Sequence, residues 1–340
     1  MIPYEIRAAL PTDEDQILEV ARHLNTVNLP HDRGAIHELL HVSEASFSGT
    51  IDINRREYVF VLRDRVRDRV IGTSMILAQL GRRDAPYIYV DVIEEEKYSA
   101  TLDRHFHHTL LRIGYSYNGP TEIGGLVLHP DYRRVPERLG QFLSYVRFLF
   151  IAAHRPLFRP EVVAELLPPL EPDGTSHLWE ALGRKFTGLS YAEADMLSKK
   201  NKEFIKQLFP ETVIYATLLD PQAQEVIGKV GAQTRGVEKM LRRIGFRYAH
   251  RVDPFDGGPH FVAETDEISL VKRTRRTLRP HIVPSGTLKS RGLLAALYPG
   301  PPFFLSVLGG LDHPDDHGAT IEQDTAEHLA SEEILTLPLD

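Results

Sequence analysis

EIGGLVLHPDYRRVPERLGQFLSYVRFLFIAAH, residues 122–154, is the stretch of sequence that says most about the fold. Its first part, 122–128, is apolar and holds two adjacent glycines, and glycine inside a strand marks a bulge or a close approach of the backbone to another group. Its last part, 141–154, is apolar on nearly every side, which predicts a buried helix. The segment therefore predicts a strand, a basic loop and a buried helix in succession.

The loop between this strand and this helix suits an anion. The N–H groups and the positive dipole end of a helix N-terminus attract phosphate groups, and Arg133 and Arg134 add positive charge. Gly140 is the one glycine in the loop, so neither the Walker pattern nor GxGxxG is present. A glycine at such a junction also serves packing alone, and that alternative stays open.

Strand and helix patterns alternate on both sides of this segment and predict an α/β (α+β) fold. Residues 105–108, which include three histidines, favour a polar helix or loop over a metal site. Beyond about residue 266, short strand-like pieces are separated by Pro and Gly turns, which predicts a body over 1–265 and a small β-rich C-terminal domain over 266–340. The predicted strands are 4–8, 58–62, 70–80, 87–92 and 161–167, and the predicted helices are 14–24, 178–182, 192–209 and 222–244.

Composition excludes several classes of protein. The chain has 340 residues and no cysteine, which rules out disulfide scaffolds, thiolate metal sites and a cysteine nucleophile. The net charge of -7 argues against binding to nucleic acid. The first ten residues lack the apolar core of a signal peptide, and no apolar run is long enough to span a membrane. We therefore expect a cytoplasmic protein that binds no metal, nucleic acid or membrane.

Several ordered blocks, covering roughly residues 1–265, resemble the arginine N-succinyltransferase family. The resemblance implies a GNAT-type acyltransferase fold, in which a central mixed, mostly antiparallel sheet is flanked by helices. It also implies an enzyme of arginine catabolism that transfers the acyl group of succinyl-CoA, as a co-substrate, directly to the amine of arginine or ornithine in a ternary complex. We expect no bound cofactor and a homo- or hetero-oligomer. The blocks are LVLHPDYRRVPERLGQFLSYVRF (126–148), VVAELL (162–167), HLWEALGRKF (177–186), AEADMLS (192–198), AQEVIGKVGAQTRGVEKMLRRIGFRY (223–248) and DPFDGGP (253–259).

The resemblance also implies functional residues. Leu126 matches the family's acyl-CoA-contacting leucine, and the bulged strand, loop and helix would hold the rest of the donor. Acidic groups should line the acceptor pocket, and Glu165 is the candidate for acceptor binding. Glu122, His177 and Tyr215 are candidates for catalysis, although each also fits a structural role. The residues expected to bind acyl-CoA are Leu126, Leu128, Arg133, Arg134, Arg138, Gly140 and Gln141.

Two departures from the family pattern affect this transfer of function. The family's phosphate loop carries two glycines around one residue, whereas this chain has Arg138 and Gly140 around Leu139. Arg138 either replaces backbone donors by its charge or indicates a different fit of the coenzyme. The family's proton-donating histidine is Gly231 here, so its role is lost, moved or taken by solvent. The alternatives are a non-catalytic or regulatory subunit that binds CoA or arginine, and a GNAT enzyme for a different amine.

Overall fold

A computed structural model describes residues 2–23, 29–83, 85–171, 173–313 and 318–339. The chain forms two compact units: unit 1 comprises Met1–Gln79, Thr121–Pro160 and Glu264–Asp340, and unit 2 comprises Leu80–Pro120 and Glu161–Ala263. Each unit is thus built from segments that are distant in the sequence. The chain returns from unit 2 to unit 1 at Glu264, next to the boundary that the sequence predicts near residue 265. A separate C-terminal domain over 266–340 stays a prediction.

Unit 1 contains an antiparallel sheet with the strand order β11-β16-β13-β14-β1-β2-β3-β6. The short strands β12 and β15 pair in parallel beside β14. The strands predicted at 4–8, 58–62 and 70–80 are confirmed. The strands are β1 (Tyr4–Ala8), β2 (Glu57–Asp64), β3 (Arg69–Leu77), β6 (Thr121–Leu128), β11 (Arg275–Leu278), β12 (His281–Val283), β13 (Arg291–Leu297), β14 (Phe304–Asp312), β15 (Thr320–Glu322) and β16 (Glu333–Leu339).

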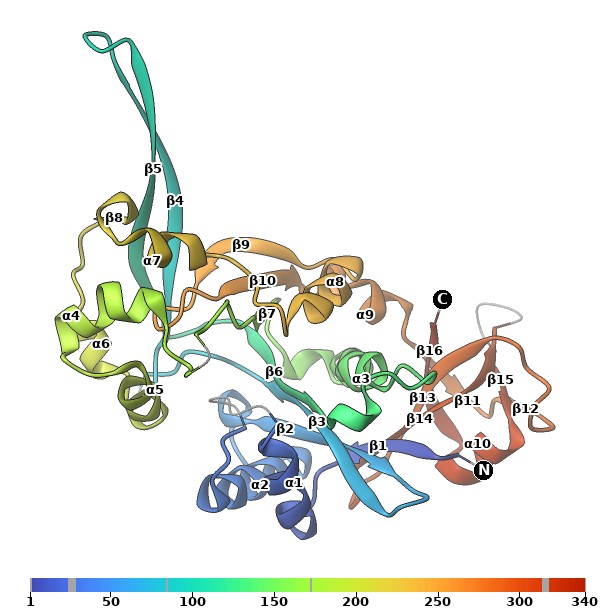
Figure 1. Ribbon diagram of the computed structural model, residues 1–340. Coiled ribbons are helices and arrows are strands. Elements are labelled where there is room, and N and C mark those ends of the chain that lie inside the picture. Colours follow the sequence, from blue (N-terminus) through green and yellow to red (C-terminus); the bar gives the residue numbers. More distant parts are fainter. Residues whose placement is uncertain (1, 24–28, 84, 172, 314–317, 340) are drawn as a thin grey trace. The chain divides into compact units, whose positions relative to one another are not determined.

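Helices cover both faces of this sheet, with α1 and α2 on one side of β2 and β3 and α3 on the other (Figure 1). Alternation along β2 explains this, because successive side chains of a strand point to opposite faces. Val59 and Val61 pack in one core cluster with residues of α1 and α2, whereas the ring of Phe60 lies 5.4 Å from that of Phe150 on α3. The helices of unit 1 are α1 (Glu14–Ala21), α2 (Arg33–Phe47), α3 (Leu139–Ala153), α9 (Ser269–Arg273) and α10 (Gln323–Leu329).

Helix α3 confirms the buried helix predicted at residues 141–154. Eleven of its 15 residues are buried, as its apolar sequence requires. The helix ends at His154, and a single 3₁₀ turn, Arg155–Leu157, follows with Pro156 inside it. Because α3 packs directly on β3 and β6, it fixes the strand and loop that precede it.

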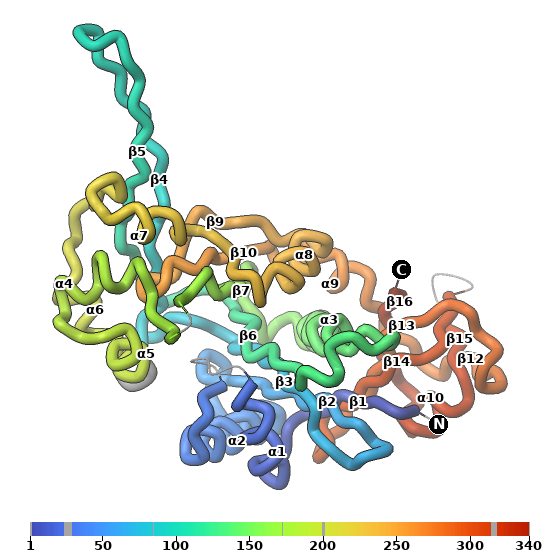
Figure 2. Tube along the Cα trace, viewed as in Figure 1, coloured from blue at the N-terminus to red at the C-terminus, as the bar shows by residue number. Residues whose placement is uncertain are grey.

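Unit 2 has the strand order β7-β10-β9-β4-β5-β8. Its longest feature is the hairpin of β4 and β5, whose traces run side by side (Figure 2) and pair from Tyr87 with Ser116 to Ser99 with Arg104. The polar helix or loop expected at 105–108 is therefore wrong. The strands are β4 (Tyr87–Ser99), β5 (Arg104–Ser116), β7 (Glu161–Glu165), β8 (Ile214–Tyr215), β9 (Arg247–Val252) and β10 (Pro259–Glu264).

Short helices pack around Trp179, which is fully buried in the core of unit 2. The helix predicted at 222–244 is interrupted, because Gly228 adopts a positive φ of 69° that ordinary helical residues avoid. The helix predicted at 192–209 is interrupted at Asn201, where the backbone is extended. The helices are a π-helical turn (Trp179–Gly183), α4 (Arg184–Thr187), α5 (Tyr191–Lys200), α6 (Glu203–Leu208), α7 (Pro221–Val226) and α8 (Arg235–Arg243).

The mixed α/β fold with a mostly antiparallel sheet flanked by helices is confirmed in both units. Within the described residues, none of the helices combines the length and apolar character needed to cross a membrane.

Candidate functional site

Strand β6 carries a bulge at the two glycines that the sequence singled out. Its pairing with β3 shifts between two points: Met75 lies opposite Gly124, whereas Thr73 lies opposite Val127. One extra residue of β6 is therefore accommodated between them. The carbonyl of Gly125 accepts a hydrogen bond of 3.0 Å from the Thr73 hydroxyl, so the bulge has a fixed conformation.

Gly125 is required by this conformation. Its φ is +54°, in the region that residues with a Cβ rarely adopt. A Cβ at this position would lie 2.5 Å from Sδ of Met75. The bulge lies next to Leu126, which is partly buried. The contact of Leu126 with acyl-CoA stays a prediction.

The loop after β6 is ordered by specific contacts. Arg133 Nε donates to the carbonyl of Leu128 at 3.0 Å, and the hydroxyl of Tyr132 donates to Asp64 at 2.8 Å. Arg134 and Arg138 are exposed. The loop that follows β6 thus carries three exposed arginines, Arg133, Arg134 and Arg138.

The N-terminus of α3 follows directly. Its N-cap residue, Arg138, is in the left-handed conformation with φ 54° and ψ 47°, and no side chain caps the helix within the described residues. The Arg138 carbonyl accepts the N–H of Gln141 at 2.8 Å. A Cβ on Gly140 would meet nothing closer than Leu128 Cδ2, at 3.8 Å. The uncapped helix end and the exposed arginines together form an anion-attracting junction.

Arg147 is a residue of this site that the sequence analysis missed. It lies on α3, is 2% exposed, and Nη1 points to the carbonyl of Gly124 at 3.4 Å. Its other contacts are with the carbonyl and hydroxyl of Ser144, at 3.0 Å each. Burial lowers the pKa of this guanidinium to about 9, and no acidic side chain pairs with it in the described part of the chain. A lone arginine in an otherwise apolar helix was the available signal.

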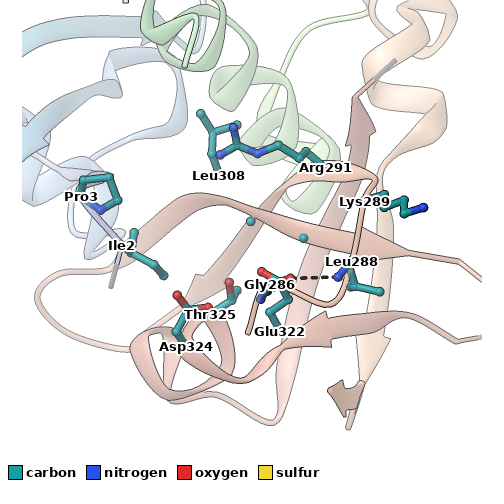
Figure 3. A pocket seen from close by; sticks show the side chains of 12 residues that line it. Ile2, Pro3, Gly286, Leu288, Lys289, Arg291, Leu308, Glu322, Asp324 and Thr325 are labelled. Carbon is teal, nitrogen blue, oxygen red and sulfur yellow. Dashed lines mark hydrogen bonds between the residues drawn. The ribbon is translucent and has the colours of Figure 1, made fainter. Parts of the chain in front are cut away.

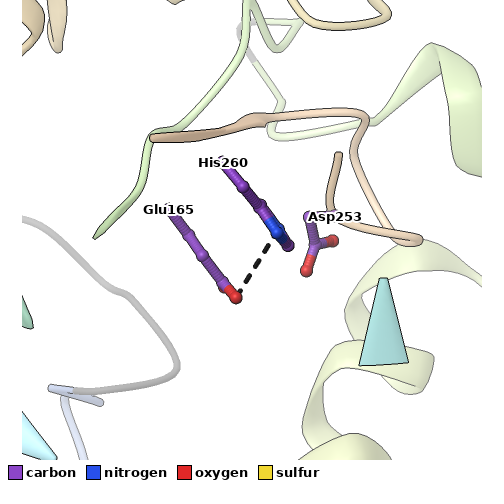
Figure 4. Close-up of side chains that lie close together, drawn as sticks. All are labelled: Glu165, Asp253 and His260. Carbon is purple, nitrogen blue, oxygen red and sulfur yellow. Dashed lines mark ion pairs between the residues drawn. The ribbon is translucent and has the colours of Figure 1, made fainter. Parts of the chain in front are cut away.

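Unit 2 holds a second polar cluster, shown in Figure 4. The metal-ligand-type atoms of Glu165, Asp253 and His260 lie within 4.8 Å of one another. One oxygen of Asp253 accepts the N–H groups of Phe255 at 2.7 Å and Asp256 at 3.3 Å, which makes it part of a turn. We interpret the cluster as a hydrogen-bonding group, and the expectation of no metal stays a prediction.

Burial dominates the electrostatics of this cluster. Burial lowers the pKa of His260 to about 3 and raises the pKa of Asp253. It also raises the pKa of Asp256 well above its usual range, and the nearby charge of Asp253 adds to this. Burial thus disfavours the protonated imidazole of His260 and the ionised carboxylates of Asp253 and Asp256. Glu165, whose side chain is 32% exposed, is the carboxyl group of this cluster most accessible to a ligand.

Gly231 lies close to the end of β7. Its N–H donates to the carbonyl of Leu167 at 2.8 Å, and a Cβ on it would lie 2.6 Å from the carbonyl oxygen of Pro168. Since that atom belongs to the backbone, a side chain at position 231 requires the loop to move. The resemblance implies a histidine at this position in the family, whereas the backbone around Gly231 leaves no room for a side chain.

The three catalytic candidates lie in separate environments. Glu122 is buried in β6, opposite Leu77. His177 Nε2 lies 2.7 Å from Glu171. The hydroxyl of Tyr215 donates to Glu95 at 3.0 Å on the β4–β5 hairpin. The structure brings none of these three into the clusters described above, and their catalytic roles stay predictions.

A separate hollow lies in the C-terminal part of unit 1 (Figure 3). Its volume is about 320 Å³, and Glu322 closes one side by accepting the N–H groups of Gly286 at 2.9 Å and Leu288 at 3.0 Å. None of the residues expected to bind acyl-CoA lines it. The hollow therefore adds nothing to the site at β6.

Comparisons with known proteins agree with this architecture. Residues 4–270 match the family described as arginine N-succinyltransferase beta subunit. The chain is 33% identical to an arginine N-succinyltransferase of Yersinia enterocolitica over 78% of this chain and 77% of that protein. It is 33% identical to arginine N-succinyltransferase subunit beta of Pseudomonas aeruginosa, over 79% of each. The solved structure of arginine/ornithine succinyltransferase subunit AI from Pseudomonas aeruginosa superposes with a TM-score of 0.83 at 25% identity and covers 99% of both chains.

The fold and these matches define an acyltransferase with a GNAT-like architecture. More specifically, the chain belongs to the arginine N-succinyltransferase family.

Proposed function

We propose that this protein transfers the succinyl group of succinyl-CoA to the α-amino group of arginine, in arginine catabolism. The observation that carries the proposal is the junction of unit 1, where a bulged strand leads through an arginine-bearing loop to an uncapped helix. Such a junction supplies N–H donors and positive charge for the diphosphate of coenzyme A. With no cysteine in the chain, transfer proceeds directly between the two substrates. The cytoplasmic location inferred from the sequence stays a prediction.

The test is incubation of the purified protein with succinyl-CoA and a panel of amines that includes arginine and ornithine, with thiol release and product mass as readouts. We expect release with arginine and a product heavier by one succinyl group. Absence of release with every amine, despite binding of succinyl-CoA, would favour the second candidate, a subunit that binds substrates without catalysing the transfer. Gly231 is the observation behind that candidate, because glycine has no group to donate a proton.

Charge reversal at Arg134 tests the donor site. Arg134 is exposed beside the α3 N-terminus, so Arg134→Glu should weaken succinyl-CoA binding about tenfold or more by removing one attraction and adding a repulsion. Isothermal titration calorimetry measures the dissociation constant. Lys289→Glu, which reverses an exposed charge elsewhere in unit 1, is the matched control and should bind like the wild type. Equal affinity of the two variants would place the diphosphate elsewhere.

We propose that the distal part of the β4–β5 hairpin contacts a second copy of the chain. It exposes three large apolar side chains: Tyr98 is 55% exposed, Leu102 62% and Phe106 42%. Tyr98 and Phe106 lie at adjacent positions of the ladder and therefore on opposite faces of the hairpin, so both faces offer apolar surface to a partner. The double variant Leu102→Asp with Phe106→Asp should dissociate the oligomer in light scattering coupled to size exclusion. Val66→Asp, at a 70% exposed position of another hairpin, should not. A monomeric wild type would contradict the proposal.

A further inference from the structure

Three polar side chains of unit 2, Glu165, His260 and Tyr87, form a row that leads from the surface into the core. The Glu165 side chain is 32% exposed, whereas that of His260 is completely buried, and Nε2 of His260 lies 3.5 Å from Oε1 of Glu165 (Figure 4). On the other side of the ring, Nδ1 lies 2.7 Å from the hydroxyl of buried Tyr87. Glu165, at one end of this row, is therefore accessible to a ligand, and Tyr87, at the other end, belongs to β4.

The surroundings of His260 decide its charge. The imidazole is neutral, because burial lowers its pKa to about 3, as do the charges of Arg251 and Lys202. A neutral imidazole has one N–H. The donor in the hydrogen bond between the Tyr87 hydroxyl and Nδ1 depends on the tautomer of the ring. We assign the N–H to Nε2, because this tautomer turns a donor towards the Glu165 carboxylate, 3.5 Å away. Nε2 makes no hydrogen bond within the described residues, so His260 acts on the carboxylate of Glu165 through this N–H dipole, which favours the ionised form.

The backbone holds Glu165 and His260 next to each other. Glu165 is the last residue of β7, and the following N–H, of Leu166, donates to the carbonyl of Pro259 at 3.1 Å. Pro259 precedes His260 in β10. On the other flank, Gly231 donates to Leu167. Glu165 is thus presented from a braced strand end, which is the arrangement that a positioned carboxylate needs.

Building on the acyl-transfer function proposed above, we propose that Glu165 binds the acceptor amine and takes its proton, and that His260 and Tyr87 are positioning residues for its carboxylate. The acceptor arrives as an ammonium ion, and Glu165 accepts one proton. The freed nitrogen lone pair forms the C–N bond with the thioester carbon, the C–S bond breaks, and a second nitrogen proton converts the thiolate to the thiol. Glu165 then releases its proton to water, which completes the balance.

The variants Glu165→Gln, His260→Leu and His260→Gln test the proposal. Glu165→Gln should lower kcat on the order of 10²-fold or more, as expected for loss of a general base, and weaken arginine binding about tenfold. Its dissociation constant for succinyl-CoA should stay that of the wild type. His37→Gln, which breaks an exposed His–Glu pair with Glu14 at 2.8 Å in unit 1, is the matched control and should leave all three quantities unchanged.

The pH profile separates positioning from folding. His260→Leu removes the N–H near Glu165, so the acid limb of kcat/KM should move to higher pH by about one unit, whereas His260→Gln, with an amide N–H, should move it less. The other charged and titratable groups acting on His260 in the described residues remain unchanged in these variants. They are Tyr87 on β4, Glu165 on β7, Arg251 on β9, Asp253 in the turn before β10 and Lys202 before α6.

The outcomes are distinguishable from failure of the proposed function. If the wild type releases thiol with arginine and Glu165→Gln does so equally fast, Glu165 is not the proton acceptor and this proposal is overturned while the acyl-transfer function stands. If the wild type releases no thiol, the proton step is rejected together with that function. Arginine binding that is unchanged in Glu165→Gln overturns the binding step in either case. A melting temperature raised by Zn²⁺ or Mn²⁺ in the wild type but not in His260→Gln makes the cluster a metal site and also overturns the proposal.

Discussion

Replacement of Gly125 by valine is expected to abolish binding of the acyl donor and to lower the free energy of unfolding by about 2–5 kcal/mol. Two effects add. Valine is strained at a φ of +54°, and its Cβ would lie 2.5 Å from Sδ of Met75, so the Met75 side chain must move as well. Relief of both requires the bulge to straighten, which returns the peptide groups around Leu126 to the regular ladder. Calorimetric titration with succinyl-CoA and denaturant unfolding measure the two effects.

Gly140→Ala is the matched control for this prediction. A Cβ at Gly140 meets only Leu128 Cδ2, at 3.8 Å, and the residue lies in the first turn of α3, where alanine is the better helix former by up to about 1 kcal/mol. We expect Gly140→Ala to be as stable as the wild type or slightly more so. If Gly125→Val proved equally stable, the bulge would not depend on glycine, and the explanation of the adjacent glycines in β6 would be wrong.

The part of the site that follows from local sequence was predicted. The strand, the basic loop and the buried helix between residues 122 and 154 depend on short-range signals: β-prone residues, interior glycines and an unbroken apolar run. The strands β2 and β3 were predicted for the same reason. Each element carries its own pattern, so knowledge of the tertiary structure was unnecessary.

The polar hairpin was mispredicted because its stability comes from pairing. Residues 94–97 and 105–108 are polar and show no clear alternation of apolar residues, which locally favours a helix or loop. In the structure, Glu96 pairs with His105 at 2.5 Å and Thr109 donates to Glu94 at 3.1 Å. Cross-strand pairs of this kind stabilise a ladder whose faces are both exposed, and a single-strand pattern does not reveal them.

The cluster around His260 could not be predicted from the sequence for a related reason. Tyr87 and His260 are 173 positions apart in the chain, and only the order β7-β10-β9-β4 brings both close to Glu165. Glu165 was predicted from its acidic side chain on a predicted strand, and the partners that orient it were not identifiable from the sequence. A buried histidine carries no local signature, because its burial depends on neighbours from other strands.

Arg147→Met is expected to retain the fold but to lose acyl transfer. A buried guanidinium without an acidic partner is expensive, because removal of a charge from water costs several kcal/mol, and methionine, an apolar residue of similar length, removes this cost. The variant also leaves the carbonyl of Gly124 and the hydroxyl of Ser144 without the donors that Arg147 supplies at 3.4 and 3.0 Å, which costs about 1–3 kcal/mol for each unsatisfied group. The two effects oppose each other, so the melting temperature should change little.

Activity should respond very differently, because Arg147 is positioned to serve the reaction. Its charge lies behind the bulge at Gly124, on the strand from which the proposed function is argued, and a buried positive charge there would stabilise a thioester oxygen that becomes negative during transfer. Loss of one such electrostatic contribution costs on the order of 10²–10³-fold in kcat. Steady-state kinetics with succinyl-CoA and arginine, alongside thermal unfolding, measure both quantities. Arg147→Lys, which keeps the charge without the planar fork, should retain more activity than Arg147→Met. A folded Arg147→Met with wild-type kcat would show that the guanidinium only satisfies the Gly124 carbonyl, and an unfolded one would show that the core depends on it.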